Sequence, residues 1–283
     1  MEYSSNYAWL GGFIMTWRRQ VNVRLARRTG IQLRQRDGRI RVIRNPRREL
    51  AQPAFIFTSV RSGSTLLRMI LDSHPDIYAP HELHLAHINV DFGLPAAENA
   101  ITALGLDRDE LTYMLWDRLL TQALRKSGKS VLVEKTPNLV FIWHRVAACW
   151  PDARFIYLLR HPAAILDSWQ RARTSQTREE AVASIISYLT YLREARRALP
   201  GHTIRYEDLT ADPVGETRRL CEFLGVPWDP AMLDYGRHDH GELLPGLGDW
   251  REKIRTGTVQ QPRPVPDIEL PPELQALAAD LGY

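Results

Sequence analysis

Residues 54–71 read A-F-I-F-T-S-V-R-S-G-S-T-L-L-R-M-I-L, and this stretch decides the fold. Residues 54–60 are apolar and rich in strand-forming side chains, which predicts a buried strand. Small and polar side chains follow at 61–65, and the apolar run 66–71 predicts a helix that ends at the turn His74-Pro75-Asp76. A strand, a tight loop and a helix in this order bind phosphate, because the loop and the helix N-terminus direct backbone N–H groups at an anion.

The loop departs from the nucleotide-binding pattern G-x-x-x-x-G-K-[ST] at two positions. Gly63 and Thr65 match the pattern, whereas Thr58 replaces the first glycine and Ser64 replaces the lysine. A Mg²⁺-dependent NTPase or nucleotide kinase is disfavoured without that lysine. Arg61, two residues before the glycine, supplies a positive charge instead. The alternative is that R-S-G-S-T only caps a helix after a strand.

The rest of the chain alternates between short apolar runs and longer amphipathic segments. Further strands are expected near residues 77–79, 131–133, 155–159 and 203–206, and helices at 107–127, from Pro162, at 178–199 and at 213–224. In the helix at 107–127, one side carries Leu111, Met114, Leu115, Leu119 and Leu124. Strands that alternate with helices predict a parallel sheet covered on both faces. We therefore expect an α/β fold, a three-layer P-loop-like domain with a central parallel sheet of about four or five strands flanked by helices.

Positive charge is concentrated at the start of the chain. Residues 1–50 contain twelve arginines, no lysine and three acidic residues, a net charge of +9 in a chain whose total is +4, so the remainder carries −5. This composition stops near Pro53, and we assign 1–52 to a basic N-terminal extension and 53–283 to one domain. The extension has three readings: a solvated segment that packs some aromatic side chains on the domain, a peripheral contact with an anionic membrane, or a nucleic-acid arm. The third is the least favoured, and we expect no nucleic-acid partner.

Nothing in the sequence indicates export. The longest apolar candidate near the N-terminus, residues 7–17, is too short for a membrane span and precedes its arginines, the reverse of a secretory signal. The two cysteines, Cys149 and Cys221, are expected to be small core residues in a reducing compartment. We therefore expect a cytoplasmic protein, with membrane association as one reading of the extension.

Residues 55–75, F-I-F-T-S-V-R-S-G-S-T-L-L-R-M-I-L-D-S-H-P, resemble the 5′-phosphosulfate loop of sulfotransferases that use 3′-phosphoadenosine 5′-phosphosulfate (PAPS). The similarity is to the branch that holds tyrosylprotein sulfotransferases and many bacterial enzymes. It implies that the loop and first helical turn wrap the phosphosulfate, through Arg61, Ser62, Gly63, Ser64, Thr65 and Leu66. Arg61 then supports the bridging oxygen as the P–O–S bond breaks.

A second motif supplies an anchor for the 3′-phosphate. Residues 154–169, R-F-I-Y-L-L-R-H-P-A-A-I-L-D-S-W, place Arg160 at a strand end and Ser168 eight residues later. A guanidinium grips phosphate through two N–H groups and a hydroxyl adds a third contact. The pair matches the family's 3′-phosphate motif at its usual spacing. Considered alone, Arg160 could equally form a structural salt bridge, and Ser168 could equally be a surface hydroxyl.

Two later segments are also similar to the family. In R-Y-E-D-L, residues 205–209, the resemblance places Tyr206 near the adenine or its phosphate, although a core tyrosine fits the sequence equally well. In G-D-W-R-E-K-I, residues 248–254, it makes Arg251 and Lys253 candidates in a loop that closes over the nucleotide. The dimerisation pattern K-x-x-x-T-V-x-x-x-E of the cytosolic animal branch is not matched, so the oligomeric state stays open.

The catalytic candidates lie in P-H-E-L-H-L-A-H, residues 80–87, and V-E-K-T-P-N, residues 133–138. Sulfuryl transfer is in-line and loose, so positioned charge matters most, but an acceptor hydroxyl still benefits from a base. Alignment with tyrosylprotein sulfotransferases favours Glu82 as that base, with His81 as the rival, and the K-T-P motif directs Lys135 at the transferring group. The histidines at 81, 84 and 87 do not form H-E-x-x-H, and we expect no metal requirement.

The resemblance implies a PAPS-dependent sulfotransferase that transfers a sulfuryl group to a hydroxyl, less readily to an amine, and releases PAP. The acceptor pocket is expected in segments 83–110, 171–180 and 236–262. Their mixed apolar and histidine side chains, together with Tyr235 directly before the third segment, suit a small-molecule or lipid-like acceptor. A peptide tyrosine is less favoured. The competing classes are a nucleotide kinase with a degenerate phosphate loop and a non-catalytic nucleotide-binding scaffold.

Overall fold

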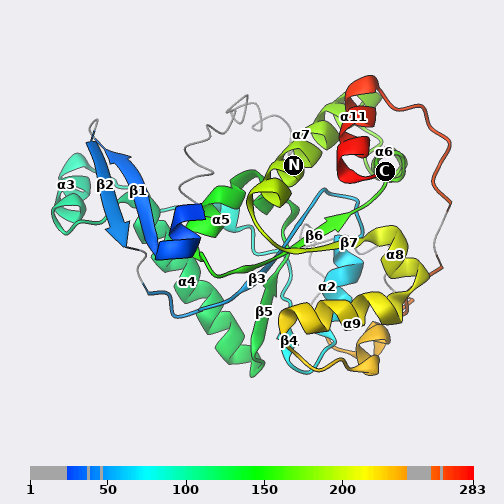
Figure 1. Ribbon diagram of the computed structural model, residues 1–283, viewed down its shortest axis with the longest axis horizontal. Coiled ribbons are helices and arrows are strands. Elements are labelled where there is room, and N and C mark those ends of the chain that lie inside the picture. Colours follow the sequence, from blue (N-terminus) through cyan, green and yellow to red (C-terminus); the bar gives the residue numbers. More distant parts are fainter. Residues whose placement is uncertain (1–23, 37–38, 45–46, 241–255, 262–263) are drawn as a thin grey trace. The chain divides into compact units, whose positions relative to one another are not determined.

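The computed structural model describes residues 24–36, 39–44, 47–240, 256–261 and 264–283 (Figure 1). The chain divides into two compact units, Met1–Pro46 and Arg47–Tyr283. The second unit thus begins at Arg47, rather than at the predicted boundary Pro53. Residues 47–50 belong to it because Arg48 pairs with Glu110 and the N–H of Leu50 donates to Asp117.

The first unit contains a two-stranded antiparallel hairpin, β1 (Ile31–Arg36) and β2 (Arg39–Arg44). The predicted basic extension therefore contains a hairpin that was not among the expected elements. Its signal was present, because apolar residues alternate with polar ones on both sides of an Asp-Gly pair at 37–38. The aromatic stretch at 7–17 and Arg18 and Arg19 lie outside the described residues.

The second unit is built on a parallel sheet with the strand order β4-β5-β3-β6-β7. The strands are β3 (Ala54–Thr58), β4 (Ile77–Tyr78), β5 (Val131–Glu134), β6 (Arg154–Leu159) and β7 (His202–Arg205). All four pairings are parallel. The predicted α/β fold with a parallel sheet is confirmed. The last predicted strand, 203–206, is shifted by one residue, because the strand begins at His202 and Tyr206 begins the next helix.

Helices cover both faces of this sheet (Figure 1). They are α2 (Ser64–Asp72), α3 (Pro95–Ala103), α4 (Arg108–Ser127), α5 (Trp143–Cys149), α6 (Pro162–Ala172), α7 (Arg178–Ala198), α8 (Tyr206–Ala211), α9 (Pro213–Leu224) and α11 (Pro272–Leu281). Short 3₁₀ turns are η2 (Leu85–His87), η3 (Pro137–Ile142), η4 (Pro230–Leu233) and η5 (Tyr235–Arg237). None of the helices that the structure describes is both long and apolar enough to span a bilayer.

The central strand β3 is buried along its whole length, and its side chains alternate between two cores. Ala54 and Ile56 pack with α2, α8 and α9 in an aliphatic cluster. Phe55 and Phe57 point to the other face, where the Phe57 ring lies 5.3 Å from that of Phe155 and the Phe55 ring lies 5.3 Å from that of Trp150 after α5. Burial on both faces explains why this strand reads as a continuous apolar run.

The predicted helix at 107–127 is confirmed as α4, but the predicted apolar side, which carries Met114, is not the side that is buried. Met114 and Leu115 are 48% and 45% exposed, whereas Trp116 and Leu120 are buried. The buried face also carries Asp117, whose carboxylate accepts hydrogen bonds from Leu50 N–H and from the Trp150 indole. The apolar pattern does not identify the buried face of this helix, because that face includes a polar side chain that is hydrogen-bonded inside the protein.

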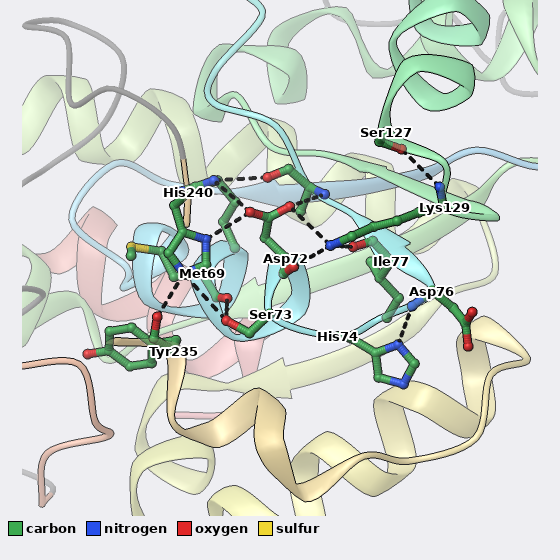
Figure 2. Close-up of polar contacts among 12 residues, drawn as sticks. Met69, Asp72, Ser73, His74, Asp76, Ile77, Ser127, Lys129, Tyr235 and His240 are labelled. Carbon is green, nitrogen blue, oxygen red and sulfur yellow. Dashed lines mark hydrogen bonds and ion pairs between the residues drawn. The ribbon is translucent and has the colours of Figure 1, made fainter. Parts of the chain in front are cut away.

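The end of α2 is fixed by Asp72, which lies at the centre of a polar cluster (Figure 2). Its Oδ1 accepts the N–H of Ala79 at 3.0 Å, and its Oδ2 lies 2.8 Å from His240 Nδ1. Lys129 donates to the backbone oxygens of Asp72 and Ile77. Burial would raise the pKa of Asp72, but these hydrogen bonds and the neighbouring positive charges outweigh it and lower the pKa. The cluster ties the helix that follows the phosphate loop to β4 and to residue 240.

We expect Asp72→Asn to lower the free energy of unfolding by about 2 kcal/mol at neutral pH, because it removes a charged acceptor from partly buried donors. Since the folded-state pKa is lowered, the contribution is complete above the ordinary value of 3.8 and is lost as pH falls through the folded value. Urea unfolding at about pH 7 and about pH 3 should therefore give a difference that shrinks in acid. Asp152→Asn, in an exposed turn, is the control. An equal difference at both pH values would contradict this account.

Candidate active site

The predicted site residues converge because the strands are parallel and end at one edge of the sheet. Each strand is followed by a candidate: β3 by the loop 61–65, β6 by Arg160, β5 by Lys135, β4 by Glu82 and β7 by Tyr206. The order of the strands places the phosphate loop in the middle, with Lys135 and Glu82 on one side and Arg160 and Tyr206 on the other.

The phosphate loop has a strained backbone. Arg61 has φ of 65° and Gly63, which caps α2, has φ of 87°. A Cβ on Gly63 would lie 2.2 Å from the Tyr206 ring, so only glycine fits at this position. Ser64, Thr65 and Leu66 form the first turn of α2, and because the Leu66 side chain belongs to the core it can contribute only its backbone.

The second motif contacts the first directly. One guanidinium nitrogen of Arg160 donates to the carbonyl of Arg61 at 2.8 Å, and Arg61 Nε donates to Ser168 Oγ at 3.1 Å. The Arg160 guanidinium also lies 4.3 Å from the centre of the Tyr206 ring. Tyr206 is therefore not an isolated core tyrosine, because its ring packs between the loop glycine and the second anchor.

Two buried polar atoms in this cluster, Ser62 Oγ and Arg160 Nε, have no hydrogen-bond partner among the described residues. Buried polar groups rarely stay unpaired. Burial lowers the pKa of Arg160, which means that its charge is poorly solvated; the neighbouring Tyr206 and Glu207 oppose this shift. Phosphate groups of a bound ligand would give such atoms partners and stabilise the charge, so the cluster fits an anionic ligand.

A brace that the sequence analysis missed lies behind the second anchor. The Glu207 carboxylate accepts the N–H of His161 at 2.9 Å and the hydroxyl of Tyr283 at 3.1 Å. The Arg205 guanidinium lies 4.4 Å from the centre of the Tyr283 ring. Glu207 and Tyr283 are 76 positions apart, and no local pattern in the sequence predicts their contact.

The catalytic candidates form an ion pair. Lys135 Nζ donates to Glu82 Oε1, and the lysine side chain is 1% exposed while that of Glu82 is 13% exposed. Burial lowers the pKa of Lys135, and the adjacent Glu82 opposes the shift. His84 Nε2 lies 3.8 Å from Glu82 Oε2. Lys135 can thus offset negative charge in a dry environment, and Glu82 can accept a proton.

His81 is exposed on the same loop and makes no side-chain hydrogen bond among the described residues. Although the residue as a whole is exposed, partial desolvation of its ring lowers its pKa, and the charge of Arg68 adds to this shift. The histidines do not share a helical face, because η2 begins only at Leu85 and His84 has a left-handed backbone. Within the described ranges, no three His, Cys, Asp or Glu side chains are placed to hold a metal ion.

Other predicted residues do not join this site. Arg251 and Lys253, expected in a loop over the nucleotide, lie outside the described residues. Tyr235, expected to line an acceptor pocket, is instead buried, and its hydroxyl donates to the carbonyl of Thr258 at 3.1 Å. That expectation is wrong because Tyr235 packs in the aliphatic core beside α2.

Comparisons with known proteins identify the family of this chain. Residues 53–230 match the model of the Sulfotransferase family. The chain is 30% identical to nodulation protein NoeE of Sinorhizobium fredii over 225 residues, which cover 67% of this chain and 53% of that protein. It is 27% identical to protein-tyrosine sulfotransferase 1 of Danio rerio over 233 residues, covering 75% and 62%. The chain therefore spans less than two thirds of the length of these curated relatives.

A solved structure with the same fold is the sulfotransferase domain from the curacin biosynthetic pathway, with a TM-score of 0.60 and 25% identity, covering 83% of this chain and 98% of that one. The sulfotransferase domain from the Synechococcus PCC 7002 olefin synthase has a TM-score of 0.61 at 24% identity, covering 84% and 98%.

Proposed function

Because this chain belongs to the sulfotransferase family, we propose that it transfers a sulfuryl group from PAPS to a hydroxyl group of an acceptor and releases PAP. The observation that carries the proposal is the direct contact between the two predicted phosphate anchors. Arg61 donates to Ser168, and Arg160 donates to the carbonyl of Arg61. One nucleotide with phosphates on both the 3′ and the 5′ oxygen of its ribose would engage both.

The donor supplies an activated sulfuryl group on a phosphate leaving group. In the proposal the loop 61–65 holds the 5′-phosphosulfate through backbone N–H groups and the hydroxyls of Ser62 and Thr65. Arg160 and Ser168 hold the 3′-phosphate, and Tyr206 provides a flat surface beside it. Arg61 lies between the two anchors, where its charge offsets that of the leaving phosphate.

On the acceptor side, Glu82 takes the proton of the attacking hydroxyl as the new S–O bond forms and the bond to the phosphate breaks. Lys135 stabilises the negative charge on the oxygens around sulfur. His81 is the less favoured base, because its side chain is exposed whereas Glu82 contacts the buried Lys135.

The acceptor is proposed to be a small or lipid-like molecule with a hydroxyl group, less readily an amine. A tyrosyl phenol is the second candidate, because similar proteins carry the name protein-tyrosine sulfotransferase. A cytoplasmic location and a membrane contact through the basic N-terminus stay predictions of the sequence.

Isothermal titration with PAP, with and without Mg²⁺ and with ATP as the comparison ligand, tests the donor. We expect PAP to bind independently of Mg²⁺ and ATP to bind weakly, since the lysine of nucleotide kinases is replaced by Ser64. Binding of ATP that requires Mg²⁺, together with no binding of PAP, would favour the nucleotide kinase class. Radiolabelled PAPS with phenols, alkyl alcohols and a tyrosyl peptide then identifies the acceptor class.

A further inference from the structure

Glu134, the last residue of β5, lies next to the Glu82–Lys135 ion pair and is completely buried. Its Oε1 accepts two hydrogen bonds, from Thr136 Oγ1 at 2.6 Å and from the backbone N–H of Leu83 at 3.3 Å. The proposed reaction gives this side chain no step, although it is buried beside the ion pair of the two catalytic candidates.

Thr136 links the Glu134 carboxylate to the backbone of the next residue in the loop, His84. Its Oγ1 accepts the backbone N–H of His84 at 3.2 Å while its hydroxyl donates to Glu134. The two consecutive N–H groups that follow Glu82 are therefore both held by the Glu134–Thr136 pair. His84 has φ of 51°, a left-handed conformation that a non-glycine residue keeps only when its surroundings fix it. The pair thus holds a strained turn directly after Glu82.

We propose that Glu134 is a positioning residue, which with Thr136 fixes the turn at residues 83–84 so that the Glu82 carboxylate meets Lys135 and the acceptor hydroxyl. The inference rests on the proposed function, because it assigns Glu134 a task in that reaction. Glu134 touches neither substrate, and its effect reaches the reaction through the backbone of the loop.

Two observations favour this task over a purely structural one. Glu134 Oε2 is buried with no hydrogen-bond partner among the described residues, which is unfavourable for stability. Burial raises the pKa of Glu134 to about 7, against the opposing effects of Thr136, Leu83 and Lys135. A carboxyl group that is costly to bury and strongly perturbed is typical of a functional site.

Glu134→Met tests the inference, since methionine is close in length and accepts no strong hydrogen bond. We expect kcat for PAP release from PAPS, with water and with 2-naphthol as acceptors, to fall about 10- to 100-fold through misplacement of the base. The KM for PAPS and the affinity for PAP should stay within about twofold, because the phosphate anchors are on other strands. Hydrogen exchange at the N–H groups of residues 83 and 84 should accelerate, while exchange in the loop 61–65 is unchanged.

Thr136 provides the graded variants. Thr136→Val keeps the shape but removes the hydroxyl, and we expect a smaller fall in kcat with faster exchange at His84 in particular. Thr136→Ser restores the hydroxyl and should restore kcat. Glu110→Met, which removes another buried carboxylate, paired with Arg48, controls for lost stability and should leave kcat at the wild-type value.

A kcat within about twofold of wild type in Glu134→Met would overturn the inference. A fall in PAP affinity that matches the fall in kcat would also overturn it, because the change would then be a general distortion. If the wild-type protein itself binds no PAP, the proposed function fails first, and the two failures are distinguished by that titration.

Discussion

Glu82→Gln is expected to lower kcat for sulfuryl transfer by about 10²- to 10⁴-fold, the usual contribution of a positioned base. Glutamine has the shape of glutamate but cannot accept the proton of the attacking hydroxyl. It also removes the negative charge that faces the buried Lys135. Because the phosphate anchors follow other strands, β3 and β6, the affinity for PAP should stay within about twofold.

The measurement is the rate of PAP release from saturating PAPS, with titration of PAP into the same preparations. Glu98→Gln is the matched control, since that carboxylate is about half exposed on α3. His81→Asn tests the rival base. If His81→Asn abolishes turnover and Glu82→Gln does not, the proton goes to the histidine and the assignment of Glu82 is wrong.

Arg160→Ala is expected to weaken PAP binding by about 100-fold, since a charged group that pairs with phosphate through two hydrogen bonds contributes about 3 kcal/mol. The side chain also holds the carbonyl of Arg61, which has a strained backbone, and packs on Tyr206. Arg160→Lys keeps the charge but not the planar fork, and we expect an intermediate affinity.

The contribution of the 3′-phosphate to binding is measured by comparing the affinities for two nucleotides. In the wild type, PAP should bind much more tightly than 5′-AMP, which lacks that group, and in Arg160→Ala the two affinities should become nearly equal. Arg197→Ala, an exposed arginine on α7, is the control. An undiminished preference for PAP in Arg160→Ala would show that another group binds the 3′-phosphate.

The parts of the site that the sequence predicts are those encoded by local motifs. The strand, loop and helix around Gly63 are contiguous in the sequence. Arg160 and Ser168 are also close in the sequence, because Arg160 follows β6 and Ser168 lies in the next helix, α6. The parallel sheet then brings these motifs together, and Arg61 contacts Ser168 as that arrangement requires. For the same reason Glu82 and Lys135, which follow neighbouring strands, form a pair.

What the sequence does not predict depends on distant contacts. The Glu207–Tyr283 brace and the Asp72–His240 pair each join segments without a shared motif, 76 and 168 positions apart. The buried face of α4 was missed because Asp117 is polar by type yet paired inside the protein. Glu134 carried a signal in its position before K-T-P, but its hydrogen bonds to the loop after Glu82 appear only once β4 and β5 are paired.

The strand order also places the residues proposed to bind the donor and those proposed to act on the acceptor after different strands, so the two groups can change separately during evolution. The groups proposed to hold the 3′-phosphate and the adenine follow β6 and β7, the proposed lysine and base follow β5 and β4, and the phosphate loop follows β3 between them. If residues 83–110 line the acceptor pocket, as the sequence predicts, we expect substitutions there to alter the choice of acceptor without disturbing how the donor is held. A lineage built on this sheet can keep one half of its chemistry fixed while exploring new acceptors with the other half.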